Sequence, residues 1–170
     1  MRRPFPAAGR RIAAAVLLAC AGAAAAGCGY VPGTVEHYQP PAAPLVDAVA
    51  CPGPVPASGS IPAGFEPVSA VVCSVTPVMT TGPQGLRSGS VEIHYAGDLG
   101  PLVAAVREPS DRSAAWVPCT EELVTPPALW LLDVFGRAML AAWPTDVCGK
   151  PKPGIEAALG TLAVTETINR

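Results

Sequence analysis

The sequence predicts a small α+β domain, in which an antiparallel sheet carries two helices and two disulfides. Short β-branched or alternating stretches recur along residues 51–170, and two stretches with helical periodicity interrupt them. The expected strands follow one another as hairpins and not as β-α-β units, which favours antiparallel pairing. Four cysteines lie in the same region of about 120 residues, and disulfides add stability to a modest core of this size.

The first half of this domain predicts two strands and a helix. Residues 68–75 are β-branched, and residues 90–95 alternate between apolar and polar side chains, with a Gly-rich loop over residues 80–89 between them. Asp98 is then placed to cap a helix, which Pro109 ends. The apolar stripe of this helix has the spacing i, i+3, i+4, i+7 and consists of Leu99, Leu102, Val103 and Val106.

The second half predicts a hairpin, a helix and a closing strand, after a short strand at residues 114–117. Residues 128–133 and 137–143 form the expected hairpin around a turn at residues 134–136. Both faces of this hairpin are apolar, so it is either a buried central pair or part of an exposed apolar patch. Helical spacing over residues 153–159 and alternation over residues 163–168 predict the last two elements.

The first 27 residues have the parts of an export signal. Arginines at positions 2, 3, 10 and 11 precede an uncharged apolar run over residues 12–27. This run is shorter than the roughly 20 residues that a membrane-spanning helix needs. Small residues from Ala25 onwards lead into Cys28, which predicts cleavage before Cys28 and attachment of a diacylglyceryl group (the palmitate-type anchor) to its thiol. We therefore expect residues 1–27 to be a lipoprotein signal peptide.

Two other interpretations of this segment stay open. Cys20 also follows leucines and an alanine, and is a second candidate for lipid attachment, whereas ordinary cleavage after an alanine would release a secreted protein. The number of cysteines favours Cys28. Cleavage there discards Cys20 and lipidation uses Cys28, so that an even number remains for an oxidising compartment. These four are Cys51, Cys73, Cys119 and Cys148.

The four remaining cysteines predict two structural disulfides. The sequence allows three connectivities, of which nearest-neighbour pairing joins Cys51 to Cys73 and Cys119 to Cys148. Each bond would stabilise the fold by about 3 kcal/mol in the chain-entropy model. No two cysteines have the C-x-x-C spacing of a zinc site, and we expect no metal and no other cofactor.

Residues 28–50 predict a tether between the anchor and the domain. Prolines at positions 32, 40, 41 and 44 disfavour regular structure and favour an extended chain. In the alternative interpretation, part of this segment packs on the domain through Tyr30, Tyr38, Leu45 and Val46. The folded domain itself is expected to span residues 51–170.

The charge excludes some partners. Removal of the signal takes away four of the eleven basic residues and none of the thirteen acidic ones, which leaves a net charge of −6. An acidic chain of this kind is not expected to bind nucleic acid, nor to be attracted to anionic lipid.

Side chains that would support catalysis are few. His37 lies in the expected tether, where we expect it to be solvated, and His94 lies on the polar side of a strand with Glu92, near Asp98. Glu121 and Glu122 are adjacent, but a glycosidase pair must converge on one cleft. No nucleophile elbow, zincin motif, phosphate loop or dinucleotide fingerprint is present in the sequence. The sequence therefore predicts no enzyme.

The tryptophans are the other candidates for a binding surface. Trp116, Trp130 and Trp143 either line a ligand groove or belong to the core and pack against the disulfides. The two interpretations differ in the exposure that they predict for each indole.

The chain as a whole resembles uncharacterised actinobacterial secreted lipoproteins. The features that carry the resemblance are the lipid-attachment motif at Cys28, the Pro-rich tether, the paired cysteines, the L-W-L-L-D-x-x-G stretch at residues 129–136 and the W-P-x-D-x-C-G-K-P stretch at residues 143–151. The resemblance implies attachment to the extracytoplasmic face of the cell membrane and no particular activity.

A partial similarity links the chain to the subtilisin-inhibitor-like proteins of Streptomyces. It rests on the order of Gly97-Asp98-Leu99, Leu102, Cys119, an apolar hairpin and Cys148. The similarity implies a protease-binding loop at residues 118–124 with its cleavable bond near Glu121. The first disulfide, the acidic residues of the loop and the lipid anchor depart from the family.

These observations predict a membrane-anchored, non-catalytic binding or assembly module of the cell envelope. Its expected partners are the membrane, through the lipid, and a protein of the envelope. A tethered or secreted protease inhibitor is the alternative.

Overall fold

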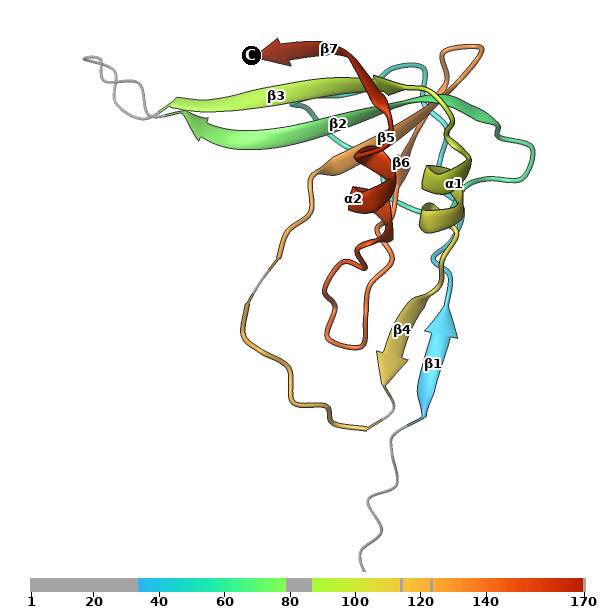
Figure 1. Ribbon diagram of the computed structural model, residues 1–170, viewed down its shortest axis with the longest axis vertical. Coiled ribbons are helices and arrows are strands. Elements are labelled where there is room, and N and C mark those ends of the chain that lie inside the picture. The colour runs from blue at the N-terminus through green and yellow to red at the C-terminus, as the bar shows by residue number, and fades with distance from the viewer. Residues whose placement is uncertain (1–33, 79–86, 114, 123, 170) are drawn as a thin grey trace, which may run out of the picture. The chain divides into compact units, whose positions relative to one another are not determined.

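The computed structural model describes residues 34–78, 87–113, 115–122 and 124–169. Within them, five strands form one antiparallel sheet in the order β6-β5-β2-β3-β7, and β1 pairs with β4 in a separate two-stranded ladder (Figure 1). The strands are β1 (Val35–Tyr38), β2 (Pro67–Val78), β3 (Arg87–Ala96), β4 (Ser110–Ser113), β5 (Ala128–Asp133), β6 (Ala138–Ala141) and β7 (Ala163–Asn169). The two helices are α1 (Gly100–Val106) and α2 (Gly154–Leu159). The predicted α+β class with an antiparallel sheet is confirmed.

The apolar hairpin of β5 and β6 is buried on both faces. Leu131 faces α1 and α2 and belongs to a core with Leu102 of α1 and Ile155 of α2. Its neighbour Trp130 faces the other way, into a second core with Val71. Of the two outcomes that the sequence left open for this hairpin, the structure shows the buried one.

A segment before β2 covers the second core and the outer edge of β6. Val46 exchanges two backbone hydrogen bonds with Ala138, at 2.9 and 2.7 Å between N and O. Gly59 donates to the carbonyl of Leu140 (3.0 Å) and accepts from Ala142 (2.9 Å). A Cβ atom at Gly59 would clash with the backbone of Pro41, so the close approach requires glycine.

The expected tether is thereby corrected in its second part. Residues 34–50 lie on the domain, because β1 pairs with β4 and because Ala43 and Val46 pack against the two cores. This is the packed alternative, through Val46 and not through Leu45, which is exposed. Residues 28–33, with Tyr30, and the signal peptide with Cys20 and Cys28 lie outside the described residues.

The helices form as their apolar spacing predicts. Leu102 and Val106 of α1 are buried, and Asp98 accepts a hydrogen bond from the N–H of Gly100 (2.9 Å) at the start of the helix. Ile155 and Ala158 bury the inner face of α2. None of the helices in the described ranges is long and apolar enough to span a bilayer.

The short strand expected at residues 114–117 is wrong. The strand is β4, four residues earlier in the chain, where Ser110 and Ser113 pair with Tyr38 and Val35. Its sequence has little β propensity, and it becomes a strand because β1 supplies a partner. The expected loop at residues 80–89 falls mostly outside the described residues.

Two disulfides crosslink the domain, and they have the nearest-neighbour connectivity. Cys51 joins Cys73 of β2, with Cα atoms 5.8 Å apart, and Cys51 is buried. Cys119 joins Cys148, with Cα atoms 5.6 Å apart, and Cys119 is exposed. The first bond therefore staples the covering segment to the sheet, and the second staples a surface loop.

Candidate functional site

A groove around Trp143 is a mostly apolar concave surface. One hollow of about 440 Å³ and another of about 330 Å³ are both lined by Trp143 and Pro127. The indole Nε1 of Trp143 donates to the carbonyl of Pro127 (3.0 Å), which fixes the ring between the two hollows. We call this surface the Trp143 groove.

The larger hollow of the groove has walls from α2 and the sheet. Its other lining side chains include Val72, Tyr95, Leu159, Leu162, Val164 and Glu156. Tyr95 and Val164 are register partners on β3 and β7, and Val164 is 57% exposed. Among the described residues, Glu156 is the one charged side chain that lines either hollow. The groove thus offers an aromatic and aliphatic surface with a single carboxylate at its side.

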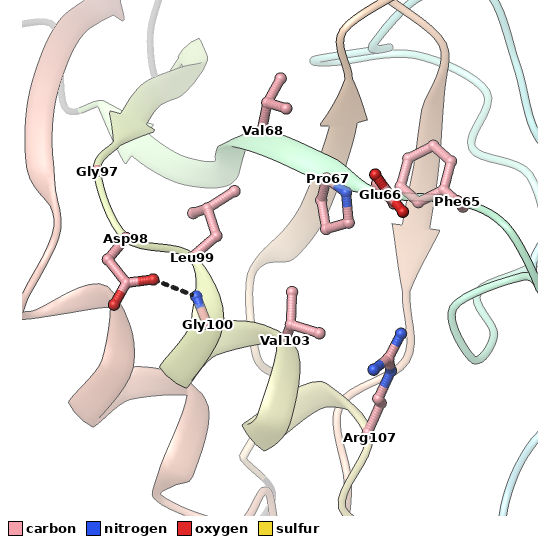
Figure 2. Close-up of a pocket in the computed structure, with 10 residues that line it drawn as sticks. All are labelled: Phe65, Glu66, Pro67, Val68, Gly97, Asp98, Leu99, Gly100, Val103 and Arg107. Atoms are coloured by element: carbon pink, nitrogen blue, oxygen red, sulfur yellow. Dashed lines mark hydrogen bonds between the residues drawn. The ribbon is translucent and has the colours of Figure 1, made fainter.

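Figure 2 shows a third hollow, of about 600 Å³, between the start of β2, the turn after β3 and α1. Val103 of α1, Leu99 just before that helix and Pro67 of β2 form its apolar walls. Arg107 points toward it from the end of α1, and within the described residues its guanidinium forms no ion pair. Glu66 also lines it. This hollow therefore has apolar walls, and its lining includes a cation, Arg107, and an anion, Glu66.

A long exposed loop follows β4. We call residues 115–122 and 124–127 the disulfide loop, because Cys119 ties it to Cys148. The ammonium of Lys150 donates to the hydroxyl of Thr120 (2.7 Å) and to the carboxylate of Glu122 (3.2 Å). Trp116 is 86% exposed at its start. The loop is therefore anchored near its middle, while its surface faces solvent.

His94 lies beside Glu92, as the alternation of β3 predicts. His94 Nε2 is 2.8 Å from the carboxylate of Glu92, which is buried. Asp98, which the sequence places near His94, bonds to Gly100 instead. Neither His94 nor Glu92 lines the Trp143 groove or the hollow of Figure 2.

His37 belongs to a polar network that joins three segments. Its Nδ1 lies 2.7 Å from one carboxylate oxygen of Asp111, and Lys152 Nζ lies 3.1 Å from the other. Lys152 also contacts the carboxylate of Glu108 (3.2 Å) and donates to the carbonyl of Pro109 (2.8 Å). His37 was expected to be solvated, and its ring is 64% exposed, yet it has a structural partner.

The pKa values in this network follow from its contacts. Hydrogen bonds from Lys152 and then His37 lower the pKa of Asp111. Burial acts to lower the pKa of Lys152, but the carboxylates of Asp111 and Glu108 outweigh burial and raise it. The carboxylate of Asp111 and the ammonium of Lys152 are therefore both favoured in their charged forms. This is typical of a structural ion pair and not of a general acid or base.

The three tryptophans have three different roles. Trp130 is fully buried in the second core, Trp143 lines the groove, and Trp116 is exposed. Glu121 and Glu122 lie on the exposed loop, and of these two Glu122 pairs with Lys150. In the part of the chain that the structure describes, no three His, Cys, Asp or Glu side chains gather as metal ligands would.

Sequence reasoning missed most of the groove. It listed Trp143 as one candidate, but Tyr95, Leu162 and Pro127 come from distant parts of the chain and carry no shared motif. Comparison of the chain with protein-family models, with curated proteins and with solved structures finds no match. The groove, the third hollow and the disulfide loop are therefore the features that bear on function.

Proposed function

We propose that the protein is a lipid-anchored module on the extracytoplasmic face of the cell membrane, which binds an envelope component without transforming it. The Trp143 groove is the observation that supports binding. It is concave, it is mostly apolar, and an indole held by a hydrogen bond separates its two hollows. The anchor at Cys28 follows from the signal sequence, and two disulfides suit an oxidising compartment.

The position of His94 argues against an enzyme built on this surface. An enzyme would need a base or nucleophile at the groove, and the titratable side chains that line it in the described residues are Glu156 and Tyr95. His94 is instead occupied with Glu92 on the other face of the sheet. The residues at the groove are suited to recognition by shape and apolar contact.

Site-specific photocrosslinking in the native membrane tests the proposal. Val164 lines the groove and is 57% exposed, whereas Val134 lies on the β5–β6 turn and is 71% exposed. A photoreactive residue at position 164 should give one crosslinked product of defined mass, and the same residue at position 134 should not give that product. Identical products from both positions, or no product from position 164, would contradict a binding role for the groove.

A protease inhibitor is the second candidate, and the disulfide loop favours it. Residues 118–122 are exposed, and the Cys119–Cys148 disulfide and Lys150 hold them in place, as a protease-binding loop requires. Progress curves of a subtilisin-type protease with increasing amounts of the protein test this candidate. Tight inhibition that is lost in Glu121→Pro would support it, and slow cleavage without inhibition would exclude it.

A further inference from the structure

Trp116 is the most exposed of the large apolar side chains in the described residues, and it lies at a particular end of the domain. β1 begins and β4 ends at the same end of their ladder, because Val35 pairs with Ser113. The hydroxyl of Ser113 donates to the carbonyl of Ala115 (2.9 Å), which holds the chain close to the end of β4. Trp116 follows directly, so it is at most about 11 Å along the chain from Ser113. Figure 1 shows the start of β1 and the first part of the disulfide loop at this same end, from which the loop runs back toward β5.

The same end of the domain is the one joined to the anchor. Five residues lie between Cys28 and Thr34, and the six Cα-to-Cα steps from one to the other span at most about 22 Å. The packing of residues 34–50 on the domain removes the rest of the expected tether. A lipid on Cys28 would therefore hold the start of β1 close to the membrane surface. This step rests on the proposed anchoring at Cys28.

We infer that Trp116 docks the domain onto the outer surface of the membrane that carries its anchor. An indole has an apolar body and one N–H donor, and tryptophan is enriched at membrane–water interfaces for that reason. Trp116 is 86% exposed, and Val35, the first residue of β1 at this end, is 47% exposed. Exposed apolar side chains beside a lipid anchor add a second contact with the bilayer, which would fix the orientation of the domain on the membrane.

The charges on this surface indicate which contact dominates. Glu121 and Glu122 are exposed on the disulfide loop, and Arg112 of β4 is engaged over the ring of Tyr38, 4.7 Å from its centroid. A surface without excess positive charge gains nothing from anionic lipid. Docking through Trp116 is therefore expected on zwitterionic bilayers, and it should change little between low and high salt.

This orientation conflicts with the inhibitor candidate. Residues 118–122 begin two positions after Trp116, and a membrane under Trp116 would keep a protease away from them. The two uses of the loop therefore exclude each other in the anchored protein.

Fluorescence quenching by brominated lipid tests the inference. The mature lipidated protein is reconstituted into phosphatidylcholine vesicles with and without brominated acyl chains, and the intact mass of the same sample reports the lipid on Cys28. Trp130 is fully buried and Trp143 is half-buried, so Trp116 is the indole that acyl-chain bromine atoms can reach most readily. We expect its emission to shift to shorter wavelength and to lose intensity in the brominated vesicles, and Trp116→Phe to remove this quenching.

A tryptophan placed elsewhere on the surface supplies the matched control. Phe135 is 80% exposed on the β5–β6 turn, which Figure 1 places away from the start of β1. In the Trp116→Phe background, Phe135→Trp should show no quenching by the brominated lipid. Equal quenching at both positions, or none at Trp116 in lipidated protein, overturns the inference and leaves the anchor in place. A membrane sample whose mass shows no lipid overturns the anchor and the inference together.

Discussion

The five-stranded sheet and the disulfide loop are held in different ways. Trp130 and Leu131 of the sheet are fully buried, on opposite faces, under two separate apolar cores. Trp116 at the start of the loop is 86% exposed, and the loop is fixed by Cys119 and by contacts of Lys150. The sheet is therefore ordered by burying apolar side chains away from water. The shape of the disulfide loop depends instead on one disulfide and a few polar contacts.

The largest effect is expected from the sheet. Leu131→Ala should lower the free energy of unfolding by about 2–5 kcal/mol, because it removes a fully buried side chain and leaves a cavity. Val134→Ala, three residues along the same hairpin and 71% exposed, should change it by less than about 0.5 kcal/mol. Urea denaturation measures both values. Similar values for the two variants would contradict the assignment of the core.

Removal of the loop disulfide should have the next largest effect. The double variant Cys119→Ser and Cys148→Ser opens a loop with a sequence separation of 29 residues, and should lose about 3 kcal/mol in the chain-entropy model. Hydrogen exchange distinguishes the regions. Amides of residues 115–122 should lose protection relative to those of β2 and β5. Unchanged protection in the loop would show that Lys150 suffices to hold it.

A smaller, pH-dependent effect is expected at the turn between β5 and β6. Burial acts to raise the pKa of Asp133, but hydrogen bonds from the Arg137 side chain (2.7 Å) and from the N–H groups of Arg137 and Phe135 outweigh burial and lower the pKa. The folded protein therefore holds this carboxylate ionised to lower pH than the unfolded chain does. Its stabilising contribution is complete above about pH 4 and is lost as the pH falls below that value.

Asp133→Asn checks this sign. The variant should be less stable than the wild type at pH 7, and the difference should shrink as the pH falls toward 2. Thermal unfolding midpoints across this range provide the measurement. A difference that grows at low pH would contradict the assigned role of Asp133.

The smallest effect on stability is expected at Trp116. Trp116→Ala should change the free energy of unfolding by less than about 0.5 kcal/mol, whereas Trp130→Ala should cost about 3–5 kcal/mol. A large destabilisation by Trp116→Ala would mean that the indole packs within the domain, and it would remove the basis for membrane docking. Denaturant unfolding of the two variants decides between these outcomes.

Local sequence patterns predicted the elements that bury their own side chains. The β-branched run of β2, the apolar hairpin of β5 and β6 and the stripe of α1 each carry their periodicity in consecutive residues. The pairing of β1 with β4 could not be predicted, because Ser110–Ser113 has no strand pattern and its partner lies in a Pro-rich segment read as a tether. That strand depends on tertiary contact and not on propensity.

The binding surfaces were less accessible to sequence reasoning than the fold. The Trp143 groove combines Tyr95, Pro127 and Leu162, whose spacing along the chain has no period. The sequence predicted a strand over residues 114–117, which would include Trp116. In the structure that strand is β4 at Ser110–Ser113, and Trp116 lies exposed beyond its end. The disulfide pairs could be predicted, because the observed connectivity is the nearest-neighbour one.

Mass spectrometry of the protein from native membranes tests the proposed anchored module most directly. Intact mass and non-reducing peptide maps should show a diacylated Cys28 at the mature N-terminus together with the pairs Cys51–Cys73 and Cys119–Cys148. An unmodified N-terminus in the culture medium, produced by cleavage after Ala25 or Ala26, would contradict the anchor and leave a secreted domain.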